Sequence, residues 1–232
     1  YWVPMYICLI NSMCAMKISK SKRNKLMLVL MLLILIVVFV PIIQHYKSKT
    51  VMNLYFSSER WSKLKLRYNN YPVHTDCALL FGDSMTENFE KHISNSHILN
   101  FGISGDFSSG LIQRIHSVVK QQPKQIFIMI GINDLIEKVP VSTIKKNYVT
   151  VLSQLQKECP ESEIFVQSTL PTRGINSLFS SSTNTNKKVS ELNILMKMIC
   201  KELNISFIDL YPLFLDHHSL LRKELSLDGI HL

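Results

Sequence analysis

The sequence predicts an α/β protein in which a sheet of five parallel strands lies between layers of helices. Two observations lead to this prediction. Short apolar runs of strand length alternate along the chain with longer segments that carry an apolar stripe at helical spacing. The short runs are apolar at consecutive positions, which is typical of parallel strands covered on both faces. This alternation favours a three-layer α/β/α sandwich with right-handed crossovers, preceded by one apolar N-terminal helix.

The expected strands are five apolar runs, at residues 78–81, 98–101, 125–130, 163–168 and 205–209. The expected helices lie between them, at residues 108–120, 142–158 and 186–203. In the last helix, the apolar stripe comprises Leu192, Leu195, either Met198 or Ile199, and Leu203. Sites in such sheets lie beyond the carboxyl ends of the strands, so the segments that follow each strand are where function is expected.

Residues 26–43 form an uncharged run of Leu, Ile, Val and Met with few other residues. As a helix this run is about 27 Å long, close to the ~30 Å hydrocarbon core of a bilayer. Basic residues precede it, so its N-terminal end is expected to stay in the cytoplasm and the rest of the chain outside. No small-residue cleavage pattern follows, which favours an uncleaved signal anchor over a removed signal peptide.

The chain thus divides into four segments. Residues 1–25 are expected to be a cytoplasmic leader. Because the chain starts at Tyr1 and Met16 resembles a natural start, 1–15 are expected to lie outside the natural protein. Residues 44–76 are expected to be a short stalk with a leading helix near 58–66, and their aromatic residues are expected to serve packing and membrane-surface contact. Residues 77–232 are expected to be the globular domain. The natural protein is expected to continue beyond Leu232.

Charge and cysteine content limit the functions that the chain can have. Seven of the 26 basic residues lie in residues 1–50, which contain no acidic residue, so residues 51–232 carry 19 basic and 17 acidic residues. Most of the net positive charge therefore lies in residues 1–50, and a nucleic-acid partner is not expected. The five cysteines are scattered and form no CxxC pair, so neither a disulfide framework nor a cysteine metal site is expected.

The run 78–81 ends in Gly82-Asp83-Ser84, and a helix-like segment follows. Glycine permits a sharp turn, which would expose the Ser84 hydroxyl above the sheet. A serine hydroxyl needs a base to become a nucleophile. His231 is the favoured base because Asp228 precedes it by three residues, so that the carboxylate can reach one ring nitrogen while the other faces Ser84. The alternative is an ordinary strand-turn-helix with a capping serine.

Four ordered blocks resemble the SGNH (GDSL-type) hydrolases, a superfamily of esterases and lipases. The blocks are Gly82-Asp83-Ser84, Asn100-Phe101-Gly102-Ile103-Ser104-Gly105-Asp106, Gly131-Ile132-Asn133-Asp134 and Asp228-Gly229-Ile230-His231. The resemblance runs from about Leu79 to Leu232 and implies a flavodoxin-like fold. It also implies that Ser84 is the nucleophile, His231 the base and Asp228 the residue that orients the base.

The oxyanion formed by attack on an ester needs fixed hydrogen-bond donors. The resemblance assigns this role to the backbone amides of Ser84 and Gly105 and to the side-chain amide of Asn133. Asp83, Asp106 and Asp134 are expected to fasten loops through backbone N–H groups. Arg173 is a weaker candidate for contact with an acidic or sugar substrate. No metal and no cofactor are expected, although His217 and His218 are adjacent.

These features predict a membrane-anchored, single-pass, extracytoplasmic serine esterase that acts through an acyl-serine intermediate. The blocks look most like the branch with platelet-activating-factor-acetylhydrolase-like and carbohydrate-acetylesterase-like proteins, which implies acetyl or other short acyl esters, on a glycan or a small molecule. Alternatives are an O-acyltransferase, a phospholipid-directed acylhydrolase or a non-catalytic binding module on a hydrolase fold. The sequence does not determine the oligomeric state.

Overall fold

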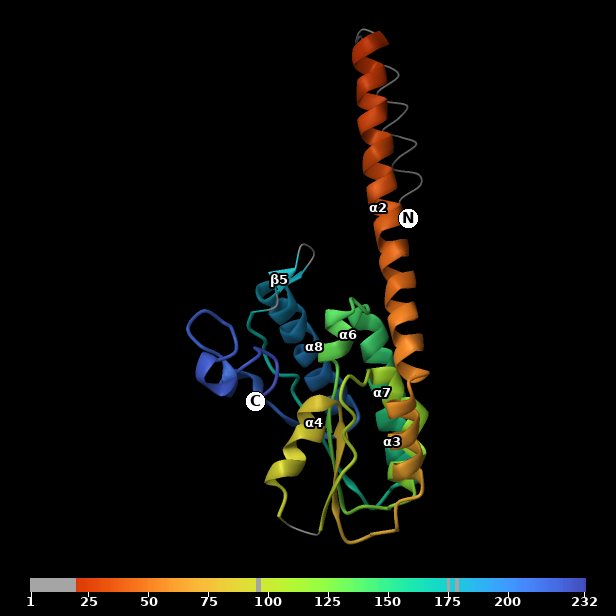
Figure 1. Ribbon diagram of the computed structural model, residues 1–232, viewed down its shortest axis with the longest axis vertical. Coiled ribbons are helices and arrows are strands. Elements are labelled where there is room, and N and C mark those ends of the chain that lie inside the picture. Colours follow the sequence, from red (N-terminus) through yellow and green to blue (C-terminus); the bar gives the residue numbers. More distant parts are fainter. Residues whose placement is uncertain (1–19, 95–96, 175, 178–179) are drawn as a thin grey trace. The chain divides into compact units, whose positions relative to one another are not determined.

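The computed structural model describes residues 20–94, 97–174, 176–177 and 180–232 (Figure 1). The chain divides into two compact units, and the boundary in the sequence falls between Lys47 and Ser48. The predicted leader residues 1–19 lie outside the described residues.

The second unit is built on a five-stranded parallel sheet. Its strands are β1 (Ala78–Gly82), β2 (Ile98–Asn100), β3 (Gln125–Met129), β4 (Glu163–Gln167) and β7 (Ser206–Ile208), in the spatial order β2-β1-β3-β4-β7. The five predicted strands are confirmed, each to within one residue at either end. A small antiparallel pair, β5 (Asn176–Ser177) with β6 (Ser180–Ser181), was not predicted, because its strands are only two residues long.

Helices cover the sheet on both faces. The longer ones are α3 (Glu59–Asn69), α5 (Ser108–Val119), α7 (Val141–Glu158) and α8 (Ser182–Glu202). The shorter ones are α4 (Ser84–Asn88), α6 (Ile132–Ile136) and the 3-10 turns η1 (Phe89–His92), η2 (Tyr211–Phe214) and η3 (Lys223–Leu225). Figure 1 shows α4 on the opposite side of the sheet from α3 and α7. The predicted three-layer α/β/α fold is therefore confirmed.

The core explains why the strands are apolar at consecutive positions. Leu79 and Phe81 of β1, Ile126 and Ile128 of β3 and Val166 of β4 share one face and have no exposed surface. The residues between them, such as Leu80 and Phe127, lie on the other face and are half-buried. Parallel strands covered on both faces need apolar side chains on both.

Helix α8 begins four residues before its predicted start, because the residues of its first turn are polar and show no helical spacing of apolar positions. Its stripe uses Ile199, which is buried, and not Met198, which is 53% exposed.

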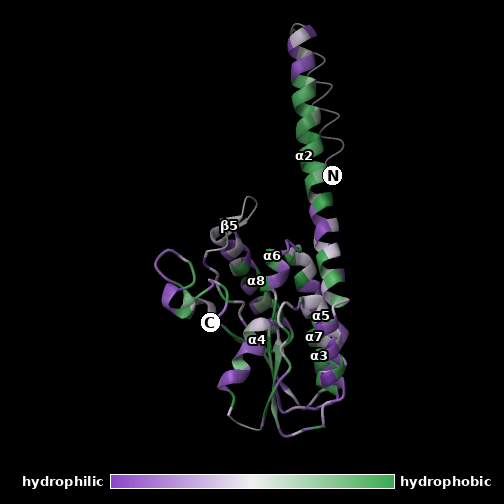
Figure 2. Cartoon of the chain, viewed as in Figure 1, coloured by the Kyte–Doolittle hydropathy of each residue, from purple (hydrophilic) through white to green (hydrophobic). Residues whose placement is uncertain are grey.

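Helix α2 (Lys20–Phe56) is long and apolar enough to cross a membrane, a property that signal sequences share. Its most apolar 18-residue window has a mean hydropathy of 3.5, and none of that window is buried within the protein. Figure 2 shows the apolar residues as a nearly continuous run along the helix. The predicted span, 26–43, lies within this helix.

The segment 44–76, for which a short stalk and a leading helix are predicted, contributes side chains to the core of the domain. From Ser48 onward the chain belongs to the same compact unit as the sheet. Trp61 and Tyr68 of α3 are buried in its core, and Tyr55 and Phe56 pack against that core. Burial stabilises the large apolar surfaces of these aromatic residues, in agreement with the packing role expected for them. Helix α3 itself agrees with the helix expected near 58–66, and Ser58 caps its N-terminus by accepting a hydrogen bond from the Trp61 amide.

Candidate active site

Ser84 lies where β1 gives way to α4. The strand ends at Gly82, where any side chain would collide with Thr86 and with the backbone of Met129. Asp83 then caps α4 by accepting a hydrogen bond from the Met85 amide at 3.0 Å. Ser84 is the first residue of α4, so its N–H is among the first-turn amides that have no acceptor within the helix. Its side chain is largely buried at the carboxyl end of the sheet.

The structure brings Asp228, His231 and Ser84 into one hydrogen-bonded chain. Nε2 of His231 lies 2.9 Å from Oγ of Ser84, and Nδ1 lies 2.6 Å from Oδ2 of Asp228. With the Nδ1 proton donated to the carboxylate, Nε2 is the acceptor that faces the serine hydroxyl. An imidazole in this arrangement can take the hydroxyl proton as the oxygen attacks a carbonyl.

The turn at 228–231 presents the carboxylate to the imidazole. Oδ1 of Asp228 accepts hydrogen bonds from the amides of Ile230 and His231, at 2.9 and 2.8 Å. Gly229 has a φ of +80°, and a side chain there would collide with the backbone of Arg173. The hydrogen bond from His231, joined by these amides, holds the pKa of the Asp228 carboxyl well below its usual range. Asp228 is therefore ionised at any pH at which His231 can act as a base.

The three residues predicted to hold the oxyanion lie on segments that follow β1, β2 and β3. Gly105 has a φ of +80°, a conformation that favours glycine. Asn133, on α6, donates a hydrogen bond from Nδ2 to the Asp106 carbonyl at 2.9 Å, which fastens the Asn133 side chain to the loop that carries Gly105. An amide nitrogen has two hydrogens, so Asn133 keeps a second donor for a substrate oxygen.

Three buried carboxyl groups support these loops, as predicted. Asp83 caps α4, Asp106 accepts from the Phe107 amide, and Asp134 accepts from both the amide and the hydroxyl of Ser108. Burial raises the pKa of Asp83 and of Asp134 to about 7, and repulsion between the neighbouring carboxylates adds to the effect. Burial also raises the pKa of Asp106, against the opposing effect of Arg114.

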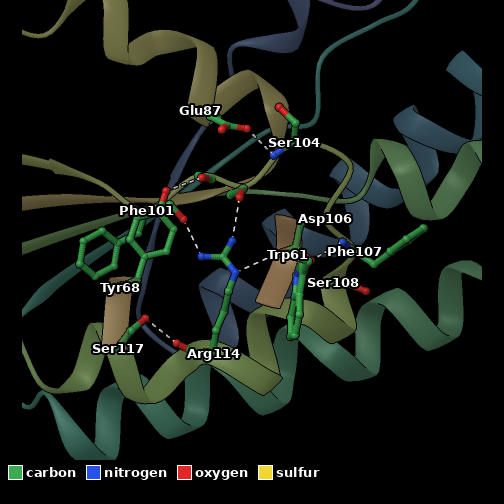
Figure 3. Close-up of polar contacts among 12 residues, drawn as sticks. Trp61, Tyr68, Glu87, Phe101, Ser104, Asp106, Phe107, Ser108, Arg114 and Ser117 are labelled. Carbon is green, nitrogen blue, oxygen red and sulfur yellow. Dashed lines mark hydrogen bonds and ion pairs between the residues drawn. The ribbon is translucent and has the colours of Figure 1, made fainter. Parts of the chain in front are cut away.

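Arg114 joins the end of β1 to the loop that follows β2, and sequence reasoning missed it. Its side chain is fully buried on α5 and pairs with Asp106 at 2.7 Å. The same guanidinium donates to the carbonyls of Phe101 and Gly82, at 2.5 and 2.8 Å, as Figure 3 shows in part. One arginine therefore connects the end of β1, the end of β2 and the Gly105 loop. The apolar stripe of the helix gave no indication of it, because arginine is usually a surface residue.

Arg173 fastens the segment that carries the Asp228–His231 turn. Its guanidinium donates to the Leu221 carbonyl at 2.5 Å and pairs with Asp216, and its backbone amide donates to the Gly229 carbonyl at 2.7 Å. These contacts account for Arg173 without any substrate. A direct contact between Arg173 and substrate stays a prediction.

A small, mostly apolar cavity lies next to the turn from β1 into α4. Met85, Leu170 and Ile230 are among its lining residues, and Ser84 is not. Its volume is about 10 Å³, roughly the space needed for one water-sized group. Among the described residues, no group of three or more His, Cys, Asp or Glu side chains could hold a metal ion.

The parallel α/β/α sandwich, with a serine, a histidine and an aspartate joined at the carboxyl ends of its strands, is the architecture of the SGNH hydrolases. The model of the GDSL-like lipase/acylhydrolase family matches residues 78–232, and the chain belongs to this family. Its members are ester-hydrolysing enzymes. The comparison with curated protein sequences finds no match.

Solved structures share the fold at low sequence identity. A Streptococcus pneumonia protein provisionally named as a platelet activating factor is 23% identical, with a TM-score of 0.65 over 83% of this chain and 90% of that chain. A GDSL-like lipase from Bacteroides thetaiotaomicron is 17% identical, with a TM-score of 0.64 over 74% and 88%. A mutant acetylxylan esterase from Geobacillus stearothermophilus is 18% identical, with a TM-score of 0.53 over 69% and 88%.

Proposed function

We propose that the protein is a membrane-anchored, extracytoplasmic serine esterase that removes short acyl groups, acetyl foremost, from carbohydrate. The observation that carries the proposal is the hydrogen-bonded chain Ser84–His231–Asp228 at the carboxyl end of the sheet. Membership of an acylhydrolase family supports ester hydrolysis as the reaction.

The geometry supports a two-step acyl transfer. Nε2 of His231 takes the proton of Ser84 while Oγ attacks the ester carbonyl, and the carbonyl oxygen becomes an oxyanion. The amides of Ser84 and Gly105 and the side chain of Asn133 are the proposed donors to that oxyanion. His231 then gives its proton to the departing alcohol, which leaves an acyl-serine. Water, deprotonated by His231, attacks the acyl-serine, and the carboxylic acid leaves as Ser84 regains its proton.

A small cavity near the site is the proposed place of the acyl group, because Met85 and Ile230, the sequence neighbours of Ser84 and His231, line it. Its volume of about 10 Å³ is close to the least that holds one water-sized group, which leaves no room for a long alkyl chain. An acetyl group carries only one methyl beyond its carbonyl, so it is the acyl group proposed for this space. That one structural neighbour is an acetylxylan esterase is consistent with carbohydrate as the alcohol part.

A series of aryl esters, from acetyl to octanoyl, tests the acyl preference. We expect the highest kcat/KM with acetyl. Leu170→Ala enlarges the cavity and is expected to raise the ratio of butanoyl to acetyl turnover at least severalfold. Leu152→Ala, in the buried face of α7, is the matched control that loses the same atoms elsewhere. Fastest turnover with octanoyl would overturn the short-acyl proposal, and transfer to an added glycan with little hydrolysis would replace the esterase by an acyltransferase.

Flotation of the full chain with phospholipid vesicles tests the anchor. Lysine at the centre of a membrane-spanning helix costs about 2.5–3.5 kcal/mol on insertion scales. The double variant Leu33→Lys, Ile36→Lys is therefore expected to leave the vesicle fraction. Leu66→Lys, at an exposed position on α3, is expected to float with them as the unchanged chain does. Flotation of the double variant would contradict insertion of α2.

A further inference from the structure

We propose that Tyr55 is a positioning residue that fixes the peptide group between Ser104 and Gly105 and so aims the Gly105 amide at the oxyanion. This inference rests on the proposed function. Tyr55 lies near the C-terminal end of α2, outside residues 78–232 that match the family model. The segment that follows the apolar part of α2 thus completes the site of the domain it precedes.

The contact with the loop is direct. The Tyr55 hydroxyl donates a hydrogen bond to the Ser104 carbonyl oxygen at 2.9 Å. The ring lies beside Gly105, where a Cβ atom would come within 3.0 Å of it. Tyr55 therefore contacts both residues of the peptide group whose N–H, that of Gly105, is one of the proposed oxyanion donors.

Peptide geometry links that hydrogen bond to the Gly105 amide. The carbonyl of Ser104 and the N–H of Gly105 belong to one planar, trans unit, and point in opposite directions. A partner that fixes the carbonyl therefore fixes the direction of the N–H. Gly105, at φ +80°, has no side chain to restrict its backbone, so the restraint has to come from outside. A hydrogen bond to the carbonyl also polarises the N–H and makes it a better donor.

The aromatic neighbours of Tyr55 hold its ring in place. Phe56 and Phe107 each lie edge-on to it with ring centroids 5.4 Å away, and Trp61 lies at 6.4 Å. Burial raises the pKa of Tyr55 well above its usual range, so the hydroxyl remains a donor at any pH at which the enzyme works.

The same N-terminal segment restrains the loop on either side of the peptide. The Ser104 amide donates to Glu87 at 2.6 Å, as Figure 3 shows, and Glu87 is paired with Arg60 at 2.6 Å. Trp61 donates from its indole to Asp106 at 3.3 Å. Two residues that precede the family match, Tyr55 and Trp61, thus contact residues 104–106 directly, and Arg60 acts on Ser104 through Glu87.

Tyr68 provides a matched control. Its buried hydroxyl also donates to a loop carbonyl, that of Gly102, at 2.8 Å. However, the N–H of that peptide group belongs to Ile103 and donates to the Gly82 carbonyl at 3.1 Å, so it is not available to a substrate. Tyr68→Phe and Tyr55→Phe each remove one hydroxyl-to-carbonyl hydrogen bond and keep the ring, but only Tyr55→Phe releases the Gly105 peptide.

The test compares the full chain with its Tyr55→Phe, Tyr68→Phe, Asn133→Ala and Ser84→Ala variants in detergent. For each, kcat and KM for an acetyl ester, the inhibition constant of an alkyl boronic acid and the melting temperature are measured. Loss of a whole oxyanion donor typically lowers turnover about 10²–10³-fold, so a donor that is only misdirected is expected to lower it about 10-fold. We expect Tyr55→Phe to lower kcat by that amount with KM unchanged and to weaken boronate binding in proportion.

Tyr68→Phe is expected to melt at a temperature close to that of Tyr55→Phe and to keep kcat within about twofold of the unchanged chain, because its peptide group serves no oxyanion. Equal kcat in the two tyrosine variants, or a loss in Tyr55→Phe that appears only in KM, would overturn the inference. Failure of the proposed function looks different: the unchanged chain would then hydrolyse no ester, or Ser84→Ala would retain its activity.

Discussion

Oγ of Ser84 and Nε2 of His231 lie 2.9 Å apart although 147 positions separate them in the sequence. The serine is held by the end of β1, where Gly82 and Asp83 shape the turn into α4. The histidine is held by a surface turn whose side chains remain partly open to solvent, 35% for His231 and 55% for Asp228. The catalytic arrangement therefore depends on how firmly that turn is fastened to the rest of the domain.

Asp228→Asn is expected to lower kcat by roughly 10²–10⁴-fold with little change in KM. The carboxylate accepts the Nδ1 proton of His231, and an amide can present a donor in its place, which would favour the wrong tautomer. Steady-state kinetics with an acetyl ester measure the effect. Asp209→Asn, at an exposed carboxylate that precedes η2, is the control and is expected to be fully active. A fully active Asp228→Asn would remove Asp228 from the proposed site.

Arg173→Ala is expected to lower kcat about 10-fold or more, since small displacements of positioned groups are costly to catalysis. Without the guanidinium, the Leu221 carbonyl and Asp216 lose their shared partner, and the segment leading to His231 is less well held. Arg222→Ala is the control on the same segment, because Arg222 only approaches Glu224, at 3.8 Å. If Arg173→Ala raised KM and left kcat unchanged, Arg173 would instead contact the substrate, the role for which it is only a weaker candidate from the sequence.

The free energy of unfolding is expected to fall as the pH rises from about 5 to about 7. The pKa of Asp83 and of Asp134 is raised to about 7 in the folded protein, against about 4 in an unfolded chain. The folded state therefore binds more protons than the unfolded state across this range, and each extra proton lowers the unfolding free energy by up to about 1.4 kcal/mol per pH unit.

Asp228 acts in the opposite sense and at lower pH. Its pKa is lowered in the folded state, so its contribution to stability is present above the unfolded pKa and is lost as the pH falls below it.

Urea unfolding at several pH values tests the raised pKa of Asp83. Between pH 5 and 7, the free energy of unfolding should decline less steeply for Asp83→Asn than for the unchanged chain. Asp209→Asn serves again as the control. Identical slopes in Asp83→Asn and the unchanged chain would contradict the raised pKa.

The sheet and the proposed reacting residues could be predicted because both depend on local patterns. Apolar runs marked the strands, and the three-residue spacing of Asp228 and His231 anticipated the turn that joins them. The supports of the site could not be predicted in this way. The buried pair of Arg114 with Asp106 and the contact of Tyr55 with Ser104, 49 positions away, arise only when distant segments pack together. The aromatic residues of 44–76 suggested packing, but not which loop they would hold.

Covalent labelling of Ser84 tests the central claim most directly, because it needs no knowledge of the natural substrate. The full chain would be treated with a fluorophosphonate, which reacts with activated serines, and then digested and mapped by mass spectrometry. We expect one adduct, on the peptide that contains Ser84, with much slower labelling in His231→Ala and none in Ser84→Ala. An adduct on a different serine, or equal labelling of the folded Ser84→Ala variant, would contradict the assignment of Ser84 as the nucleophile.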